Sequence, residues 1–165
     1  MKILVLSDSH SGLSFMRRCV DTLWPDYIIH LGDYMDDGAA IAEEYPYIRV
    51  YQVPGNCDRF RCLQPQPEIL KPIIGGVSFY MTHGHLYNVK FTYSRLIAAA
   101  REAGAACALF GHTHEACCEL LEDGLWLMNP GACGSWGGSC GLIEIEDGKI
   151  NACRILRQAE LEVFK

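Results

Sequence analysis

Five short polar motifs occur in this chain, each at or just beyond the end of an apolar run. The motifs are Asp8-Ser9-His10, Gly32-Asp33, Gly55-Asn56-Cys57-Asp58, His83-Gly84-His85 and Gly111-His112-Thr113-His114. In open α/β sheets, ligands gather in the crevice beyond the carboxyl ends of the strands. If the apolar runs are strands of such a sheet, the motifs converge. The sequence therefore predicts one polar site assembled from five strand ends.

The first third of the chain alternates between strand and helix patterns. Short apolar runs predict buried strands, and the amphipathic segments between them predict helices. The predicted strands are Lys2–Leu6, Tyr27–His30 and Ile48–Val53, and the predicted helices are Ser14–Leu23 and Gly38–Glu44. This β-α-β-α-β order favours a parallel sheet.

The remainder of the chain is rich in turn signals. Three Gly-containing pairs, Gly75-Gly76, Asp123-Gly124 and Asp147-Gly148, separate apolar runs and predict hairpins. The runs are Ile69–Ile74 with Val77–Thr82, Ala116–Glu122 with Leu125–Asn129, and Cys140–Glu146 with Lys149–Leu156. Between the first two hairpins we expect a helix over Asn88–Ala103 and a buried strand over Ala106–Phe110. The whole chain, residues 1–165, is expected to form one α/β domain.

Charge and composition exclude several classes of protein. The chain has 20 acidic against 14 basic residues, a formal net charge of -6, and lacks the excess of Lys and Arg that binds nucleic-acid polymers. The longest near-apolar stretch, Ala103–Phe110, is too short for a membrane span. Met1–Leu6 is typical of a strand rather than a signal peptide, and the nine cysteines include no C-x-x-C pair. We therefore expect reduced thiols and a cytoplasmic protein.

The residue types in the five motifs indicate a metal centre. Carboxylate and amide oxygens mixed with imidazole nitrogens suit divalent transition ions, and a two-metal site needs a carboxylate that bridges. An extended backbone would point Asp8 and His10 the same way, and likewise His112 and His114, so each pair could serve one ion. Trp136, in a glycine-rich stretch, could line a substrate cleft.

The five motifs, in this order and followed by Asn129-Pro130-Gly131, resemble the calcineurin-like metallophosphoesterases, and among them the short YfcE-type phosphodiesterases. The resemblance covers nearly the whole chain and implies a four-layer αββα sandwich. It implies that Asp8, His10 and His114 hold one ion, that Asn56, His83 and His112 hold the other, and that Asp33 bridges them. The implied reaction is hydrolysis of a small phosphate ester, most simply a phosphodiester, by in-line attack of a metal-bridging hydroxide. Mn²⁺ is the first expectation for both ions, with Fe, Co, Ni or Zn as alternatives.

Two positions depart from the wider superfamily. Cys57 stands where a histidine usually follows the asparagine and is taken to protonate the leaving group. A thiol is a poor acid for an alkoxide, so we expect weaker activity on esters with poor leaving groups. His85 is the nearest candidate for this role, and Asp58 is expected to orient a metal ligand or the phosphate. Asn56, Asp58 and His85 therefore form the expected catalytic set. After Asn129-Pro130-Gly131, the chain has Ala132-Cys133-Gly134 where relatives often have a Ser and a downstream Arg. Any contact with phosphate at this position would therefore have to come from backbone N–H groups.

Two other residues near the motifs have simpler interpretations. His30 precedes Asp33 within a strand, and we expect a hydrogen-bonded histidine behind the metal ligands. Cys57 is expected to be a packed thiol rather than a nucleophile.

Other functions remain open from the sequence. A scaffold could keep this fold without catalysis, as the retromer subunit of the same superfamily is thought to do. A phosphomonoesterase or phosphoprotein phosphatase is the other alternative. The sequence does not fix the oligomeric state, and a homo-oligomer is compatible with it.

Overall fold

A computed structural model of the chain describes residues 1–59, 66–134 and 137–161, and these residues form two β-sheets. The first sheet has the strand order β11 (Lys149–Arg157), β10 (Ser139–Glu146), β1 (Lys2–Leu6), β2 (Tyr27–His30) and β3 (Arg49–Gln52). The second has the order β4 (Ile69–Leu70), β6 (Val77–Thr82), β7 (Cys107–Leu109), β9 (Trp126–Asn129) and β8 (Cys117–Leu120), and β5 (Ile73–Ile74) also pairs with β6.

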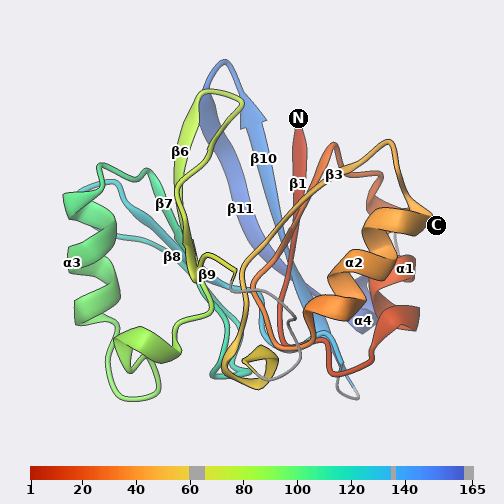
Figure 1. Cartoon of the computed structure of the whole chain (residues 1–165). Helices are drawn as coiled ribbons and strands as arrows, with labels where there is room; N and C mark the ends of the chain where they lie inside the picture. The colour runs from red at the N-terminus through yellow and green to blue at the C-terminus, as the bar shows by residue number, and fades with distance from the viewer. Residues whose placement is uncertain (60–65, 135–136, 162–165) are drawn as a thin grey trace.

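Helices cover the outer faces of the two sheets. On one side lie α1 (Leu13–Leu23), α2 (Met35–Glu44) and the short α4 (Gln158–Leu161), and on the other lies α3 (Ser94–Glu102) (Figure 1). Two single 3₁₀ turns, η1 (Asn56–Asp58) and η2 (His85–Tyr87), follow β3 and β6. The expected four-layer αββα sandwich is confirmed. None of the helices formed by the described residues has both the length and the apolar character that a membrane crossing requires.

The alternation along β1 explains why its sequence is apolar throughout. Leu4 and Leu6 face the layer beneath α1 and α2, whereas Ile3 and Val5 face the layer between the sheets. Because successive side chains of a strand point to opposite faces, a central strand packed on both faces must be apolar at every position. All four of these side chains are fully buried.

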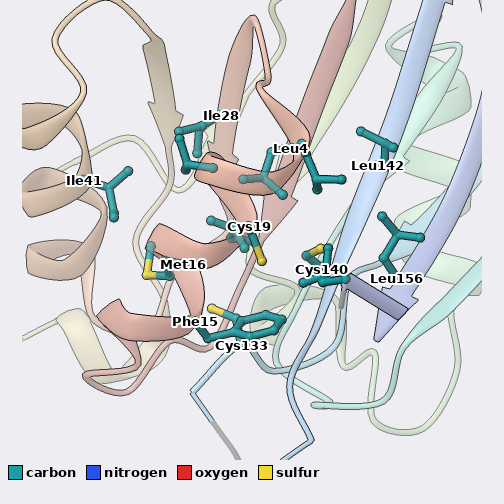
Figure 2. Packing of buried hydrophobic residues seen from close by; sticks show 14 of the residues in the cluster. Leu4, Phe15, Met16, Cys19, Ile28, Ile41, Cys133, Cys140, Leu142 and Leu156 are labelled. Carbon is teal, nitrogen blue, oxygen red and sulfur yellow. The ribbon is translucent and has the colours of Figure 1, made fainter. Parts of the chain in front are cut away.

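The layer between the first sheet and its helices is shown in Figure 2. Met16 and Cys19 of α1 lie against Leu4 and Ile28, and the thiols of Cys133 and Cys140 lie close to Cys19. These three buried cysteines are free thiols that fill apolar space, in keeping with the prediction of reduced cysteines.

Both sheets contain parallel strands that end at the same edge. β1, β2 and β3 are parallel to one another, as the sequence predicted, and β6, β7 and β9 form a parallel centre in the second sheet that it did not. The hairpins β8–β9 and β10–β11 are confirmed as antiparallel. The hairpin at Gly75-Gly76 is also present, but its first strand divides into β4 and β5 around Pro72.

The helix predicted over Asn88–Ala103 is wrong at its start. α3 begins only at Ser94, because Asn88 adopts a left-handed conformation with φ 54° and ends the turn η2. The carbonyl of Asn88 then accepts a hydrogen bond from the N–H of Phe91 at 3.0 Å. Residues 88–93 therefore form a turn-rich loop beside the polar edge of the sheets.

Candidate metal centre

The five polar motifs meet at the carboxyl edge of the two sheets. Asp8 follows β1, Asp33 follows β2 and Asn56 follows β3 in the first sheet. His83 follows β6, and His112 and His114 follow β7 in the second. The parallel direction of these strands places all the motifs at one edge, so the seven predicted ligands lie in a continuous group of contacts.

One part of the group contains four residues whose donor atoms all lie within 4.8 Å of one another: Asp8, His10, Asp33 and His114. The Nε2 atom of His114 is 3.1 Å from Oδ1 of Asp8 and 3.5 Å from Nε2 of His10. The two carboxylates are buried, the imidazole of His114 is exposed to solvent, and that of His10 is half-buried. This donor set has the composition and spacing of a site for one divalent ion.

A second part of the group is centred on His83. Its Nε2 atom is 3.2 Å from Oδ1 of Asn56, and its ring centroid is 5.1 Å from that of His112. The Nδ1 atom lies 2.7 Å from the carbonyl oxygen of Leu31. Since a carbonyl can only accept, Nδ1 donates to Leu31, and Nε2 is the ring nitrogen that faces the site.

Asp33 lies between the two parts. Its Oδ2 atom is 3.9 Å from Nε2 of His10, and its Oδ1 atom is 3.5 Å from Nε2 of His83. Oδ1 also accepts a hydrogen bond from the backbone N–H of Cys57 at 2.9 Å. Burial acts to raise the pKa of Asp33, but the neighbouring His83 and the hydrogen bonds from Cys57 outweigh it and lower that pKa. The carboxylate is therefore ionised and in contact with both groups of donors.

Asp8 has one oxygen tied to the protein and one that is not. Oδ2 accepts hydrogen bonds from the Ser7 hydroxyl at 2.6 Å and from the His112 N–H at 3.1 Å. Oδ1 is buried and accepts no hydrogen bond, although Nε2 of His114 is near it. A buried carboxylate oxygen without a partner is costly.

No Lys or Arg side chain in the described part of the chain forms an ion pair with Asp8 or Asp33. Two buried carboxylates surrounded by imidazole nitrogens, one of them with a bare oxygen, fit a divalent cation better than they fit a closed hydrogen-bond network.

The backbone at the ligand positions corrects one prediction. Asp8, His10, Asp33, His112 and His114 all have positive φ, with values of 52°, 41°, 52°, 69° and 62°. The segments are therefore kinked, not extended, and the two histidines of His112-Thr113-His114 approach different partners, His83 and Asp8. Left-handed conformations are uncommon outside glycine, and each stores of order 1–3 kcal/mol of strain that the surrounding structure must hold.

Glycines beside the ligands are required by space. A Cβ atom on Gly55 would overlap the carboxylate of Asp33, and one on Gly111 would overlap the Ser7 hydroxyl and approach Oδ2 of Asp8. These positions let the backbone of one motif approach the carboxylate of another.

Asp58 is buried, and both oxygens of its carboxylate accept hydrogen bonds from backbone N–H groups. Its Oδ1 accepts hydrogen bonds from the N–H groups of Tyr34 and Met35, both at 2.9 Å, and its Oδ2 accepts one from Gly55 at 2.8 Å. Both oxygens are thus used to join the loop after β3 to the start of α2. Asp58 positions the segments that carry Asp33 and Asn56.

Asp37 is a residue that sequence reasoning missed. Its Oδ2 accepts hydrogen bonds from the Ser9 hydroxyl at 2.7 Å and from the Ser11 N–H at 2.8 Å, so it fixes the loop that carries Asp8 and His10. Nε2 of His30 lies 3.1 Å from the same Ser9 hydroxyl. The sequence offered one signal for this role, an acidic residue in the first turn of the helix that follows Gly32-Asp33. Acidic residues are also favoured there by the helix dipole, so the signal did not single out Asp37.

His30 and His112 are kept neutral by their surroundings. Burial is the main cause that lowers the pKa of His30 to about 4, and it also lowers that of His112 to about 4, with additional effects of His83 and Lys90 on His112. His30 is fully buried and lies against Ser9, between the candidate ligands Asp8 and His10 in the chain.

His85 and Cys57 border the centre. Nε2 of His85 is 3.6 Å from Oε2 of Glu68, and the ring lies 5.5 Å from His83 and 6.1 Å from His112. Cys57 is exposed, not packed as expected. Partial desolvation of its sulfur by the surrounding protein, together with the hydrogen bond and charge of the adjacent Asp33, raises the pKa of the Cys57 thiol to about 11. Trp136 lies outside the described residues.

Comparison with known proteins gives relatives of one kind. The chain is 32% identical to a probable metallophosphoesterase, YsnB of Bacillus subtilis, over 136 residues that cover 80% of this chain and 75% of that protein. It is 29% identical to the phosphodiesterase MJ0936 of Methanocaldococcus jannaschii over 149 residues, which cover 81% of this chain and 84% of the relative.

Solved structures share the fold. Vps29 of Entamoeba histolytica, solved in complex with Zn²⁺, superposes with a TM-score of 0.75 at 21% identity and covers 95% of this chain and 98% of its own. YfcE, a phosphoesterase from E. coli, superposes with a TM-score of 0.62 at 18% identity and covers 93% of this chain and 98% of its own. The family description "calcineurin-like phosphoesterase superfamily domain" matches residues 1–148, and the chain belongs to this superfamily.

Proposed function

We propose that the protein is a phosphodiesterase that depends on two divalent metal ions. The observation that carries this proposal is the position of Asp33, which has one carboxylate oxygen toward His10 and the other toward His83. A carboxylate shared in this way is what a two-metal site requires. Asp8, His10 and His114 would hold one ion, and Asn56, His83 and His112 the other.

Divalent ions held there would supply an acidified water and positive charge for the phosphate oxygens. The residues of the chain fix the geometry on which that chemistry depends. Asp37 holds the loop of Asp8 and His10, Asp58 holds the segments of Asp33 and Asn56, and the Leu31 carbonyl fixes the tautomer of His83. Mn²⁺ is our first assignment, with Fe, Co, Ni or Zn as alternatives, because mixed oxygen and nitrogen ligands do not select among them.

The substrate is proposed to be a small phosphodiester. The name of the M. jannaschii relative supports this class. We propose that His85 donates the proton to the leaving group, since its ring lies near His83 and His112, and Cys57 offers no acid of suitable pKa.

A scaffold without catalysis is the second candidate, favoured by the structural similarity to Vps29. The complete set of seven candidate ligands argues for the enzyme, because a scaffold has no chemical need for two imidazole-rich groups on either side of one carboxylate.

Replacing the shared carboxylate tests the proposal. Asp33→Asn should lower kcat for bis(4-nitrophenyl) phosphate by at least about 100-fold, because an amide is a weaker bridging ligand and would no longer hold two ions in place to stabilise the charge that develops on the phosphate. We would measure the rate of hydrolysis by Mn²⁺-loaded protein and its metal content by mass spectrometry. Glu43→Gln, on an exposed turn of α2, removes the same charge away from the centre and should leave both unchanged. Near-normal turnover by metal-loaded Asp33→Asn would reject the two-metal assignment.

Removing the support beneath the first loop should weaken metal binding without unfolding the protein. In Asp37→Ala, Ser9 and Ser11 lose their common acceptor, and we expect Mn²⁺ affinity to fall about 10–100-fold. Asp37→Asn keeps one acceptor oxygen, so its Mn²⁺ affinity should fall less than that of Asp37→Ala. The measurement is competition with a fluorescent chelator, with circular dichroism to check the fold. Equal affinity in wild type and Asp37→Ala would show that the loop does not need this contact.

Restoring a histidine at position 57 tests the leaving-group argument. Cys57 is exposed, and Cys57→His should raise kcat on alkyl phosphodiesters by about tenfold or more but hardly change it on nitrophenyl esters, whose leaving groups need no proton. Cys57→Ser is the matched control and should resemble wild type on both substrates. An equal gain on both ester classes would refute the argument.

A further inference from the structure

A hollow of about 570 Å³ adjoins Thr113, in the segment that also carries His112 and His114. Its wall includes Lys90, Phe91, Thr92, Tyr93, Thr113 and Glu115, and we call it the Phe91 hollow. Thr113 stands between His112 and His114, so the wall is continuous with the segment that carries two candidate ligands. A phosphate ester held at the centre could therefore extend one of its substituents into the hollow.

Phe91 is the most unusual residue of this wall, because its side chain is 91% exposed. The loop that carries it is anchored on both sides. Val89 is buried, the ring of Tyr93 packs on Phe110 with centroids 4.9 Å apart, and the N–H of Phe91 donates to the Asn88 carbonyl. The loop is thus fixed on both sides of Phe91, while the phenyl ring projects into solvent at the rim of the hollow with its faces free, which suits stacking by a flat aromatic group.

The hollow also contains one charge of each sign. Neither the Lys90 ammonium nor the Glu115 carboxylate forms an ion pair with any residue in the described ranges. The backbone N–H of Glu115 donates to the Thr113 hydroxyl oxygen at 3.1 Å, which fixes the backbone of Glu115 next to the segment that carries His112 and His114. The lysine can attract an anion, and the glutamate can accept hydrogen bonds from hydroxyl or amino groups.

We propose that the Phe91 hollow is a substrate subsite for a flat aromatic group esterified to the phosphate, with the ring stacked on Phe91. The proposal rests on the proposed function, because it needs the phosphate at the metal centre. Lys90 draws in the anionic ester, and Glu115 accepts from polar groups attached to the ring. An aryl ester and a nucleotide share this chemistry.

Two phosphonates that differ only in the ring test the subsite by calorimetry on Mn²⁺-loaded protein. Phenylphosphonate should bind about tenfold more tightly than methylphosphonate, a difference typical of stacking on one aromatic side chain. Phe91→Ala should abolish the preference and Phe91→Tyr should keep it. Leu86→Ala is the control, since Leu86 is also an exposed apolar residue, but it does not line the hollow. No preference in wild type, or an unchanged one in Phe91→Ala, would overturn the proposal.

The two sources of the aromatic group are separated by a second comparison. If the occupant is a nucleotide, adenosine 5′-monophosphate should bind more tightly than phenyl phosphate, and Glu115→Gln should remove that gain. If the occupant is a simple aryl ester, phenyl phosphate should bind at least as tightly as adenosine 5′-monophosphate. Glu115→Gln should then change the affinity for neither compound. Either result supports the subsite, whereas binding of both no tighter than methyl phosphate would reject it.

Failure of the subsite can be told apart from failure of the proposed function. Calorimetry needs no turnover, so a ring preference that follows Phe91 in a protein that hydrolyses no diester would reject the activity alone. Diester hydrolysis without any ring preference would reject the subsite alone.

Discussion

Two buried carboxylates without a lysine or arginine partner in the described part of the chain are the constraint on which this structure depends. Asp8 and Asp33 lie at the ends of two neighbouring parallel strands, surrounded by imidazole rings. An ionised carboxylate in such a place must be compensated, because transfer of a charge out of water is costly. Histidines that are neutral cannot do this, and burial keeps the pKa of His112 low. A bound divalent cation would provide the missing charge, which links folding to metal binding.

The rest of the polar edge is arranged to hold these two groups in place. Five ligand positions take the left-handed conformation, and Gly55 and Gly111 admit close contacts that any side chain would block. The buried carboxylates of Asp37 and Asp58 accept backbone N–H groups from the loops that carry the ligands. The hydrogen bonds accepted by Asp37 and Asp58 therefore offset the backbone strain of these loops. The loops in turn begin at strands that are packed on both faces.

Sequence patterns predicted those parts that depend on local periodicity. The bounds of β1 and β2 agree with the prediction, and the convergence of the motifs follows from the parallel direction of their strands. The roles of Asp37 and Asp58 could not be predicted, since each depends on contacts with residues more than twenty positions away. The same holds for the kinked backbone at His112 and His114. The late start of α3 depends on one left-handed residue, Asn88, and moves Phe91 from an expected helix to the rim of a hollow.

If Asp33 is shared by two metal ions, as we propose, the stoichiometry of metal binding shows it most directly. Protein stripped by a chelator and titrated with Mn²⁺ should bind two ions per chain, as counted by native mass spectrometry, and Asp33→Asn should weaken both binding steps. A stoichiometry of one ion per chain, or loss of only one step in the variant, would contradict the account.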